Sequence, residues 1–231
     1  MIELRDAAVV VDDPHGPVTL LEPVSLALPE HRIGIIGANG SGKSTLARLL
    51  NGLVEPSSGQ VLVDGRDVVE DGREVRRRVG FVFTHPDAQL VMPTPVEDVT
   101  LSLRRTVRGR AERRRRALEV LDAIGLADRA EVSVHVLSGG QKQLLALAGV
   151  LATDPDVVVA DEPTTLLDLR NSRQVADRLF ALRQQLVLVT HDLDLARRCD
   201  RVLVVDSGRI VHDGPADAAV DHYVALCGET T

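Results

Sequence analysis

Aromatic residues and cysteines are scarce in this chain. Among its 231 residues are three phenylalanines, one tyrosine and no tryptophan, so few rings are available for nucleic-acid bases to stack on. The net charge of −7 also argues against nucleic-acid binding, and we expect no nucleic-acid partner. The two cysteines, Cys199 and Cys227, lie far apart. They predict reduced thiols in a cytosol rather than a disulfide or a metal site.

Long hydrophobic runs are also absent. No stretch approaches the roughly 18 apolar residues that a membrane span needs. The start of the chain has no charged segment followed by an apolar one, which a secretory leader requires. We therefore expect a soluble protein that is not secreted. Its 44% of hydrophobic residues are enough for one large domain, or for a core with an inserted lobe.

The most informative stretch is Gly37 to Ser44, which reads Gly-Ala-Asn-Gly-Ser-Gly-Lys-Ser. An apolar run ending at Ile36 precedes it and a helical pattern closed by Gly52 follows it, which is the order of strand, loop and helix in a phosphate-binding loop. The glycines let successive backbone N–H groups face a phosphate. Lys43 supplies a positive charge, and the Ser44 hydroxyl suits Mg²⁺.

The rest of the pattern predicts an α/β fold with a P-loop nucleotide-binding core, an antiparallel β subdomain and an inserted α-helical subdomain. Strands are expected in the first thirty residues and over 59–68, 79–83, 157–160, 186–189 and, as a pair, 201–212. Helices are expected from a Thr94 cap, over 111–124, from a Ser138 cap, and around Val175 to Leu182. We assign 1–84 and 151–231 to the core and 85–150 to the helical subdomain. The last residues carry no clear signal.

Two further motifs carry chemistry. A short apolar strand delivers Asp161 and Glu162 to its carboxyl end, where ligands bind in an open parallel sheet. Asp161 is suited to hold Mg²⁺, and Glu162 to orient or deprotonate an attacking water. The second motif is Leu-Ser-Gly-Gly-Gln, from Leu137 to Gln141, which begins a helix with unobstructed backbone N–H groups. It predicts a second phosphate-binding site.

Together these motifs resemble those of the ATP-binding-cassette (ABC) ATPases, and the resemblance covers nearly the whole chain. The phosphate loop, the Leu137 to Gln141 signature, the Asp161-Glu162 pair, Asp168 and His191 follow in that family's order. In the family, two ATPase units pair head to tail around two ATP molecules. The resemblance therefore implies an ATPase that acts as a dimer, with ATP and Mg²⁺ as its ligands.

The resemblance also assigns roles to residues. It implies that Glu162, His191 and Lys43 are catalytic, and that Ser44, Asp161 and Thr84 face the metal. Nucleotide contacts within one chain are expected from Gly37, Asn39, Gly40, Ser41, Gly42, Lys43, Ser44 and Thr45. Contacts from the partner copy are expected from Ser138, Gly140 and Gln141, with Asp168 in the loop that crosses the interface.

Two positions depart from the family pattern. Thr84 stands where the family usually has a glutamine that reaches Mg²⁺ and the attacking water. No aromatic residue occurs in the first eighty positions, where the family usually stacks the adenine base on a ring. We expect Val10, Val11 or His15 to take that place.

A further segment, His85-Pro-Asp-Ala-Gln89-Leu, resembles one in energy-coupling-factor (ECF) transporter ATPases that lies beside the groove for a membrane scaffold. It makes Gln89 a partner-contact candidate, with a polar loop as the alternative. The resemblance implies a peripheral subunit on the cytoplasmic face of the membrane, with a scaffold subunit, a substrate-binding membrane subunit, and a second ATPase copy or a related chain. Biotin is the favoured substrate. The alternatives are a cobalt or nickel importer, a conventional ABC transporter and an assembly factor of the iron–sulfur type.

Arginines gather between Arg104 and Arg116. Because no aromatic side chains are interleaved with them, we interpret the cluster as a solvated helix face rather than a nucleic-acid site. Proximity to a membrane surface would give the cluster a secondary role.

Overall fold

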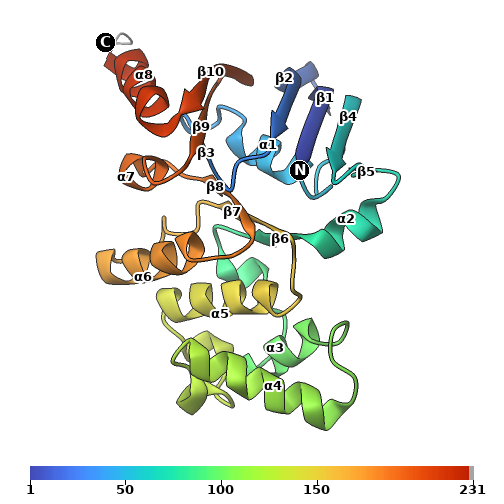
Figure 1. Cartoon of the computed structure of the whole chain (residues 1–231), viewed down its shortest axis with the longest axis vertical. Helices are drawn as coiled ribbons and strands as arrows, with labels where there is room; N and C mark the ends of the chain where they lie inside the picture. The colour runs from blue at the N-terminus through green and yellow to red at the C-terminus, as the bar shows by residue number, and fades with distance from the viewer. Residues whose placement is uncertain (229–231) are drawn as a thin grey trace.

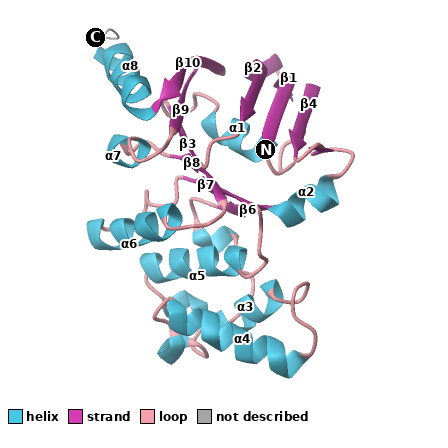
Figure 2. Ribbon diagram, in the orientation of Figure 1, coloured by secondary structure: helices cyan, strands magenta, loops and turns pink. Residues whose placement is uncertain are grey.

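The computed structural model describes residues 1–228, which form two β-sheets and the helices around them (Figures 1 and 2). The strands are β1 (Ile2–Asp13), β2 (Gly16–Leu28), β3 (Arg32–Ile36), β4 (Ser58–Val63), β5 (Arg66–Asp67), β6 (Val79–Val82), β7 (Val157–Asp161), β8 (Gln185–Val189), β9 (Arg201–Asp206) and β10 (Arg209–Pro215). The smaller sheet is antiparallel, in the order β2-β1-β4-β5. The larger sheet has the order β10-β9-β3-β8-β7-β6 and is parallel except for β10.

The helices are α1 (Lys43–Leu49), α2 (Gly72–Arg78), α3 (Pro95–Ser102), α4 (Arg110–Ala123), α5 (Gly139–Leu151), α6 (Leu169–Phe180), α7 (Leu193–Ala196) and α8 (Ala216–Gly228). Three 3₁₀ turns are η1 (Pro86–Ala88), η2 (Ala127–Arg129) and η3 (Val134–Val136). Helices α3, α4 and α5 gather at the end of the molecule away from the antiparallel sheet, and α8 lies beside β9 and β10 (Figure 1). None of the helices in the described part is long and apolar enough to cross a membrane.

The central strands are buried on both faces, which explains their apolar sequences. Every residue of β3 and β7 is buried. One hydrophobic cluster fills the space between the two sheets around α1, and a second joins the other face of the parallel sheet to the helices α3 to α6. Because β3, β7 and β8 run parallel, their carboxyl ends meet at one edge, where the functional side chains lie.

Local sequence signals set several element boundaries as expected. The Thr94 side chain accepts from the backbone N–H of Glu97 at the start of α3, and Ser138 and Gln141 form a reciprocal capping box at the start of α5. Tight turns at Asp64-Gly65 and Ser207-Gly208 place both residues at positive φ, which suits a two-residue hairpin. The predicted α/β fold with an antiparallel sheet and a parallel sheet is confirmed.

Helices α2, α7 and α8 were not predicted. Their apolar faces are narrow: α2 buries only Val75 and the backbone of Gly72, and α7 buries only Ala196. Helix α8 packs Ala219 and Val220 against the face of β9, which a sequence window with so few large apolar residues does not reveal. Cys199 is buried in the same cluster as a free thiol, and burial raises its pKa to about 12.

Candidate nucleotide-binding and catalytic site

The phosphate-binding loop connects β3 to α1 and requires glycine at specific points. Gly37, Gly40 and Gly42 all have positive φ. A Cβ on Gly37 would lie 2.0 Å from the Val205 carbonyl oxygen, and one on Gly42 would lie 2.7 Å from the Leu20 carbonyl oxygen. The loop is therefore curled tightly against β9 and β2, and its backbone shape depends on having no side chains there.

The Lys43 ammonium group lies within this curled loop. Its Nζ donates to the carbonyl oxygens of Gly37 at 2.9 Å and Ala38 at 2.8 Å. Burial lowers the pKa of Lys43, while the charges of Glu162 and Asp161 act to raise it. The buried Ser41 hydroxyl has no hydrogen-bond partner among the described residues. A lysine and an unpaired hydroxyl in one loop suit a phosphate group, which accepts from both.

The other expected residues of this loop lie where a nucleotide can reach them. Asn39 and Gly40 are exposed at the tip, and Thr45 is half-buried in the first turn of α1. No side chain caps α1, since its N-cap is Gly42. The first amides of the helix and of the loop are therefore free of side-chain partners in the described part of the chain.

Asp161 occupies the centre of the expected metal site and is only 2% exposed. Its Oδ1 accepts from the Ser44 hydroxyl at 2.9 Å, and its Oδ2 lies 3.7 Å from the Arg48 guanidinium. Burial raises the pKa of Asp161, and the hydrogen bond from Ser44 acts against that rise. Hydroxyl and carboxylate oxygens side by side match the hard oxygen ligands that Mg²⁺ prefers. The described residues contain no cluster of three or more metal-ligating side chains, so phosphate and water oxygens would complete the coordination.

Thr84, the third expected metal residue, lies at the end of β6 next to this pair. Its hydroxyl donates to the backbone carbonyl of Asp161 at 2.8 Å. The hydroxyl proton is therefore engaged in joining the ends of two neighbouring strands, and only the oxygen lone pairs remain for a ligand.

Glu162 has an unusual backbone conformation, with φ of 52° in a residue other than glycine. Its backbone N–H donates to the carbonyl of Val189 at 3.0 Å, which holds it to the end of β8. The carboxylate Oε2 accepts from the Thr165 hydroxyl and from His191 Nδ1, both at 2.8 Å. Residues held in sparsely populated φ/ψ regions cluster at active sites, and this one is held by hydrogen bonds of both its backbone and its side chain.

His191 follows β8 and is 58% exposed. Because a carboxylate can only accept a hydrogen bond, the Glu162 contact places the proton on Nδ1. The other ring nitrogen, Nε2, has no hydrogen-bond partner in residues 1–228. Sequence order alone suggested that Glu162 and His191 belong to one site, and the structure joins them directly.

The Leu137 to Gln141 signature lies elsewhere in the chain. The Ser138 hydroxyl accepts from the Gln141 backbone N–H at 3.3 Å, and the Gln141 side chain accepts from the Ser138 N–H at 3.0 Å. A Cβ on Gly140 would lie 2.4 Å from the Asn171 side chain, so α5 begins in close contact with α6. No hydrogen bond or ion pair within the described residues joins the signature to the phosphate loop.

Asp168 caps the start of α6. Its two carboxylate oxygens accept from the backbone N–H and the side-chain amide of Asn171, both at 2.8 Å. The loop before it also approaches the signature, because the nearest atoms to a Cβ on Gly139 belong to Leu166 and Leu167. Asp168 and Gly140 are therefore linked through the Asn171 side chain, whereas the sequence predicted only that both lie at the same interface.

Three residues of this region were not predicted from the sequence. Thr165 donates to the Glu162 carboxylate, Arg48 faces Asp161, and Asn171 separates Asp168 from Gly140. Only Thr165 carried a signal, since it follows Glu162 by three residues in a turn. Arg48 and Asn171 are contacts across the fold that no local pattern indicates.

With this geometry established, comparison with known proteins identifies the family. The model of the ABC transporter family matches residues 21–165, which are more than half of the chain. The chain belongs to the ABC transporter ATP-binding family, and it is an ABC ATPase. An ABC transporter ATP-binding protein of Deinococcus radiodurans is 51% identical over 223 residues, which are 96% of this chain and 97% of that protein.

Other relatives carry more specific names. The biotin transport ATP-binding protein BioM of Rhizobium etli is 43% identical over 209 residues, covering 90% of this chain and 92% of that protein. The methionine import ATP-binding protein MetN of Caulobacter vibrioides is also 43% identical, over 87% of this chain and 64% of that protein. A dimeric ATP-binding cassette solved in a post-hydrolysis state with ADP and Pi matches with a TM-score of 0.83 at 31% identity, covering 94% of this chain and 99% of that one.

Proposed function

We propose that this chain hydrolyses ATP with Glu162 as the general base and with His191 as its positioning partner. The observation that carries the proposal is the hydrogen bond between Glu162 and His191 Nδ1 at 2.8 Å, at the carboxyl ends of β7 and β8 beside the phosphate loop. Glu162 Oε1 has no hydrogen-bond partner among the described residues, so a water molecule can donate to it.

The phosphate loop holds the nucleotide in this proposal. Lys43, Ser41 and the loop amides bind the phosphates, and Ser44 with Asp161 holds Mg²⁺, whose bound charge offsets the negative charge that develops during phosphoryl transfer. The Lys43 ammonium and the Asp161 carboxylate are both buried, and burial lowers the pKa of Lys43 and raises the pKa of Asp161. A bound phosphate would supply negative charge beside Lys43, and Mg²⁺ would supply positive charge beside Asp161.

We further propose that the chain acts as a pair, with each ATP between one copy's phosphate loop and the other's signature. Three of the most exposed large hydrophobic side chains support this: Leu169 at 67%, Val136 at 62% and Leu166 at 56%. Val136 adjoins the signature, and Leu166 and Leu169 flank Asp168. Apolar side chains gathered at one place on a surface are typical of a protein–protein interface.

The transport partner is proposed to be a membrane scaffold of the energy-coupling type, with biotin as the favoured substrate. The 43% identity to a biotin transport protein supports this, and the equal identity to a methionine import protein keeps a conventional importer as the second candidate. The chain then lies at the cytoplasmic face of the membrane as a peripheral subunit. The assembly-factor alternative receives no support from these relatives, whose names all describe transport.

The segment from His85 to Leu90 is well placed to transmit partner contact to the signature helix. Lys142 Nζ lies 2.7 Å from Asp87 Oδ1, and Gln89 Nε2 donates to the Ala146 carbonyl at 3.2 Å. The Gln89 Oε1 also accepts from Phe83 at 3.3 Å. Since both ends of the Gln89 amide are engaged within the chain, we propose that Gln89 couples this segment to α5, while His85 and Asp87 are its exposed polar side chains.

Isolation of the protein from its native membranes in mild detergent tests the transport proposal. We expect mass spectrometry to identify a scaffold subunit together with a small substrate-binding membrane protein. Recovery of a scaffold with two similar transmembrane subunits and no small membrane protein would instead support a conventional importer. Recovery of soluble partners alone would contradict both.

Replacement of Thr84 by glutamine is expected to leave ATP binding intact and to preserve or raise hydrolysis. Glutamine is the residue that the family usually has here, and the lost hydrogen bond to the Asp161 carbonyl costs about 1 kcal/mol of stability. Steady-state turnover and a nucleotide titration measure the two effects. Thr84→Val serves as the control, because it removes the hydroxyl without adding a longer side chain. A large fall in turnover of the glutamine variant would show that the Thr84 hydroxyl has a dedicated role.

The base site is expected to bind ATP and GTP with similar affinity. Val10 and Val11 are about 40% exposed on β1 and His15 is exposed in the following turn, so the base meets no phenylalanine, tyrosine or tryptophan ring there. Apolar contact alone does not distinguish the amino group of adenine from the keto group of guanine. A competition titration measures the ratio, with Val11→Tyr as the comparison variant that adds a ring. Strong preference of the unmodified protein for ATP would contradict the expectation.

A further inference from the structure

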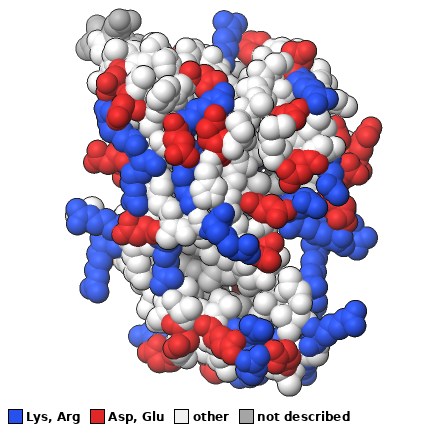
Figure 3. Space-filling view, viewed as in Figure 1, with Lys and Arg blue, Asp and Glu red and all other residues white. Residues whose placement is uncertain are grey.

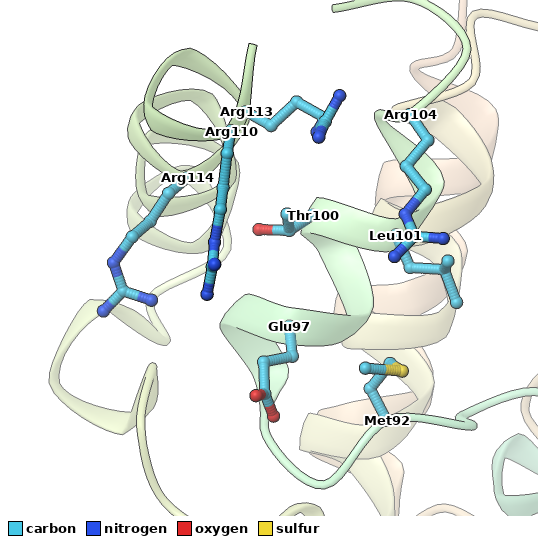
Figure 4. A pocket seen from close by; sticks show the side chains of 8 residues that line it. All are labelled: Met92, Glu97, Thr100, Leu101, Arg104, Arg110, Arg113 and Arg114. Atoms are coloured by element: carbon cyan, nitrogen blue, oxygen red, sulfur yellow. The ribbon is translucent and has the colours of Figure 1, made fainter.

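Four arginines of the cluster line a pocket between α3 and α4. The pocket has a volume of about 340 Å³, and Figure 4 shows Arg110, Arg113 and Arg114 on one side of it and Arg104 on the other. Thr100 projects its hydroxyl between them from α3. The sequence-based interpretation of a solvated helix face therefore holds for only part of the cluster.

The arginines of the cluster divide into two groups by their partners. Arg115 pairs with Glu112 and Glu119 on the outer face of α4, and Arg116 approaches the same two glutamates. Figure 3 shows both signs of charge mixed over the face that it presents, including the lower lobe. These outward arginines are neutralised within their own helix.

The pocket arginines have few such partners. Arg114 pairs with Glu131, but no ion pair within residues 1–228 involves Arg104, Arg110 or Arg113. The Nε of Arg113 is buried without a hydrogen-bond partner, and its Nη1 makes only a long contact of 3.4 Å to a backbone carbonyl. A buried guanidinium donor without an acceptor is costly, and a bound anion would supply the acceptor.

The start of α4 adds to the positive potential at this pocket. Its N-cap is Gly109, which provides no side-chain hydrogen bond, so the first amides of the helix lack a side-chain cap. Arg110 and Arg113 place positive charge at the helix end where the macrodipole is already positive, and the acidic residue of that turn, Glu112, pairs with Arg115 and Arg116. An anion in the pocket would offset this positive charge, because the pocket is lined by the guanidinium groups of Arg110 and Arg113.

The chemistry of the lining favours a phosphate ester. Guanidinium groups match phosphate oxygens with paired hydrogen bonds, and Thr100 offers a further hydroxyl. Glu97 lies at the end of the pocket away from Arg113 (Figure 4). A ligand that is anionic throughout would be repelled there, whereas a ligand with one phosphate and an uncharged or cationic remainder fits both ends.

We propose that this pocket binds the phosphate group of an organic phosphate, supplied either by an anionic phospholipid head group or by a small soluble ester. Two probes distinguish the sources: vesicles of phosphatidylglycerol in phosphatidylcholine, and glycerol 3-phosphate. All measurements use the full chain with saturating MgADP, so that the phosphate loop is filled. Co-sedimentation measures vesicle binding, and calorimetry measures glycerol 3-phosphate binding.

The test variant is Arg110→Gln with Arg113→Gln. Its matched control is Arg115→Gln with Arg116→Gln, which removes the same charge from the same helix outside the pocket. We expect the unmodified protein to bind one of the probes, and the test variant to bind it at least tenfold more weakly, since each arginine near an anionic surface contributes roughly fivefold. The control is expected to change by less than threefold.

The outcome identifies the source or overturns the proposal. If the test variant loses vesicle binding and the control variant does not, the ligand is a lipid head group. If the test variant loses glycerol 3-phosphate binding and the control variant does not, the ligand is a soluble ester. Equal loss in the test and control variants would show that only overall charge matters, and failure of the unmodified protein to bind either probe would be equally decisive against the pocket. If the double variant does not fold, Arg104→Gln, outside α4, is expected to give the same selective loss at roughly fivefold.

Discussion

Replacing Glu162 by glutamine is expected to reduce steady-state ATP hydrolysis on the order of a thousandfold, within the range that a general base contributes. The amide cannot accept a proton from water, yet it has the size of the carboxylate and can still accept from Thr165 and His191. Nucleotide binding should therefore be unchanged. Turnover under saturating MgATP and a separate binding titration distinguish the two steps.

The same variant is expected to accumulate as a dimer with ATP. In the proposed pair, we expect the γ-phosphate to bridge the two copies and favour the closed state until hydrolysis removes it, so blocking hydrolysis holds the closed state. Size-exclusion chromatography with and without MgATP detects it. Glu70→Gln is the control, because it removes the same charge from an exposed position. A Glu162→Gln protein that remains a monomer with ATP, under conditions in which other ABC ATPases dimerise, would contradict the proposed pairing.

Replacing Lys43 by glutamine is expected to weaken ATP binding at least a hundredfold, about 3 kcal/mol, because it removes a buried charge-assisted contact to phosphate. The free protein should lose little stability. The Lys43 ammonium is buried and its pKa is lowered by that burial, so its removal relieves a desolvation cost that offsets the two lost hydrogen bonds to the loop.

Thermal unfolding provides the measurement for Lys43. At a ligand concentration a hundred times the dissociation constant, ATP stabilises a protein by about 2.7 kcal/mol, which for a chain of this size raises Tm by roughly 5 to 10 °C. We expect the unmodified protein to show this shift and Lys43→Gln to show almost none. Arg183→Gln, on the exposed surface, is the charge-matched control. An undiminished shift in Lys43→Gln would exclude Lys43 from phosphate binding.

The sequence predicted those features of the fold that depend on local geometry. The phosphate loop follows from three glycines and a lysine between a strand and a helix, and the caps of α3 and α5 follow from Thr94 and Ser138. The paired positive-φ residues at Ser207 and Gly208 mark the hairpin between β9 and β10. Each of these signals lies within a few residues along the chain, where backbone conformation is set by side chains nearby.

The features that the sequence did not predict depend on contacts between distant segments. Helix α8 is stabilised by packing on β9, and its own pattern is too weak to identify it. The bond of Thr84 to the Asp161 carbonyl exists because β6 and β7 are neighbours, and the division of the arginines into outward and pocket groups depends on where α3 lies. The residue types alone contain no information about these contacts between distant segments.

The close contact of Gly140 with Asn171 has a mechanical consequence. Asn171 donates to both oxygens of Asp168 and packs against Gly140, so a shift of the start of α5 relative to the start of α6 would disrupt this packing. In the proposed pair, we therefore expect the signature and the loop before α6 to move together when the two copies separate. The distance between a spin label on the signature and a second label on the phosphate loop of the other copy would then report the separation of the two copies.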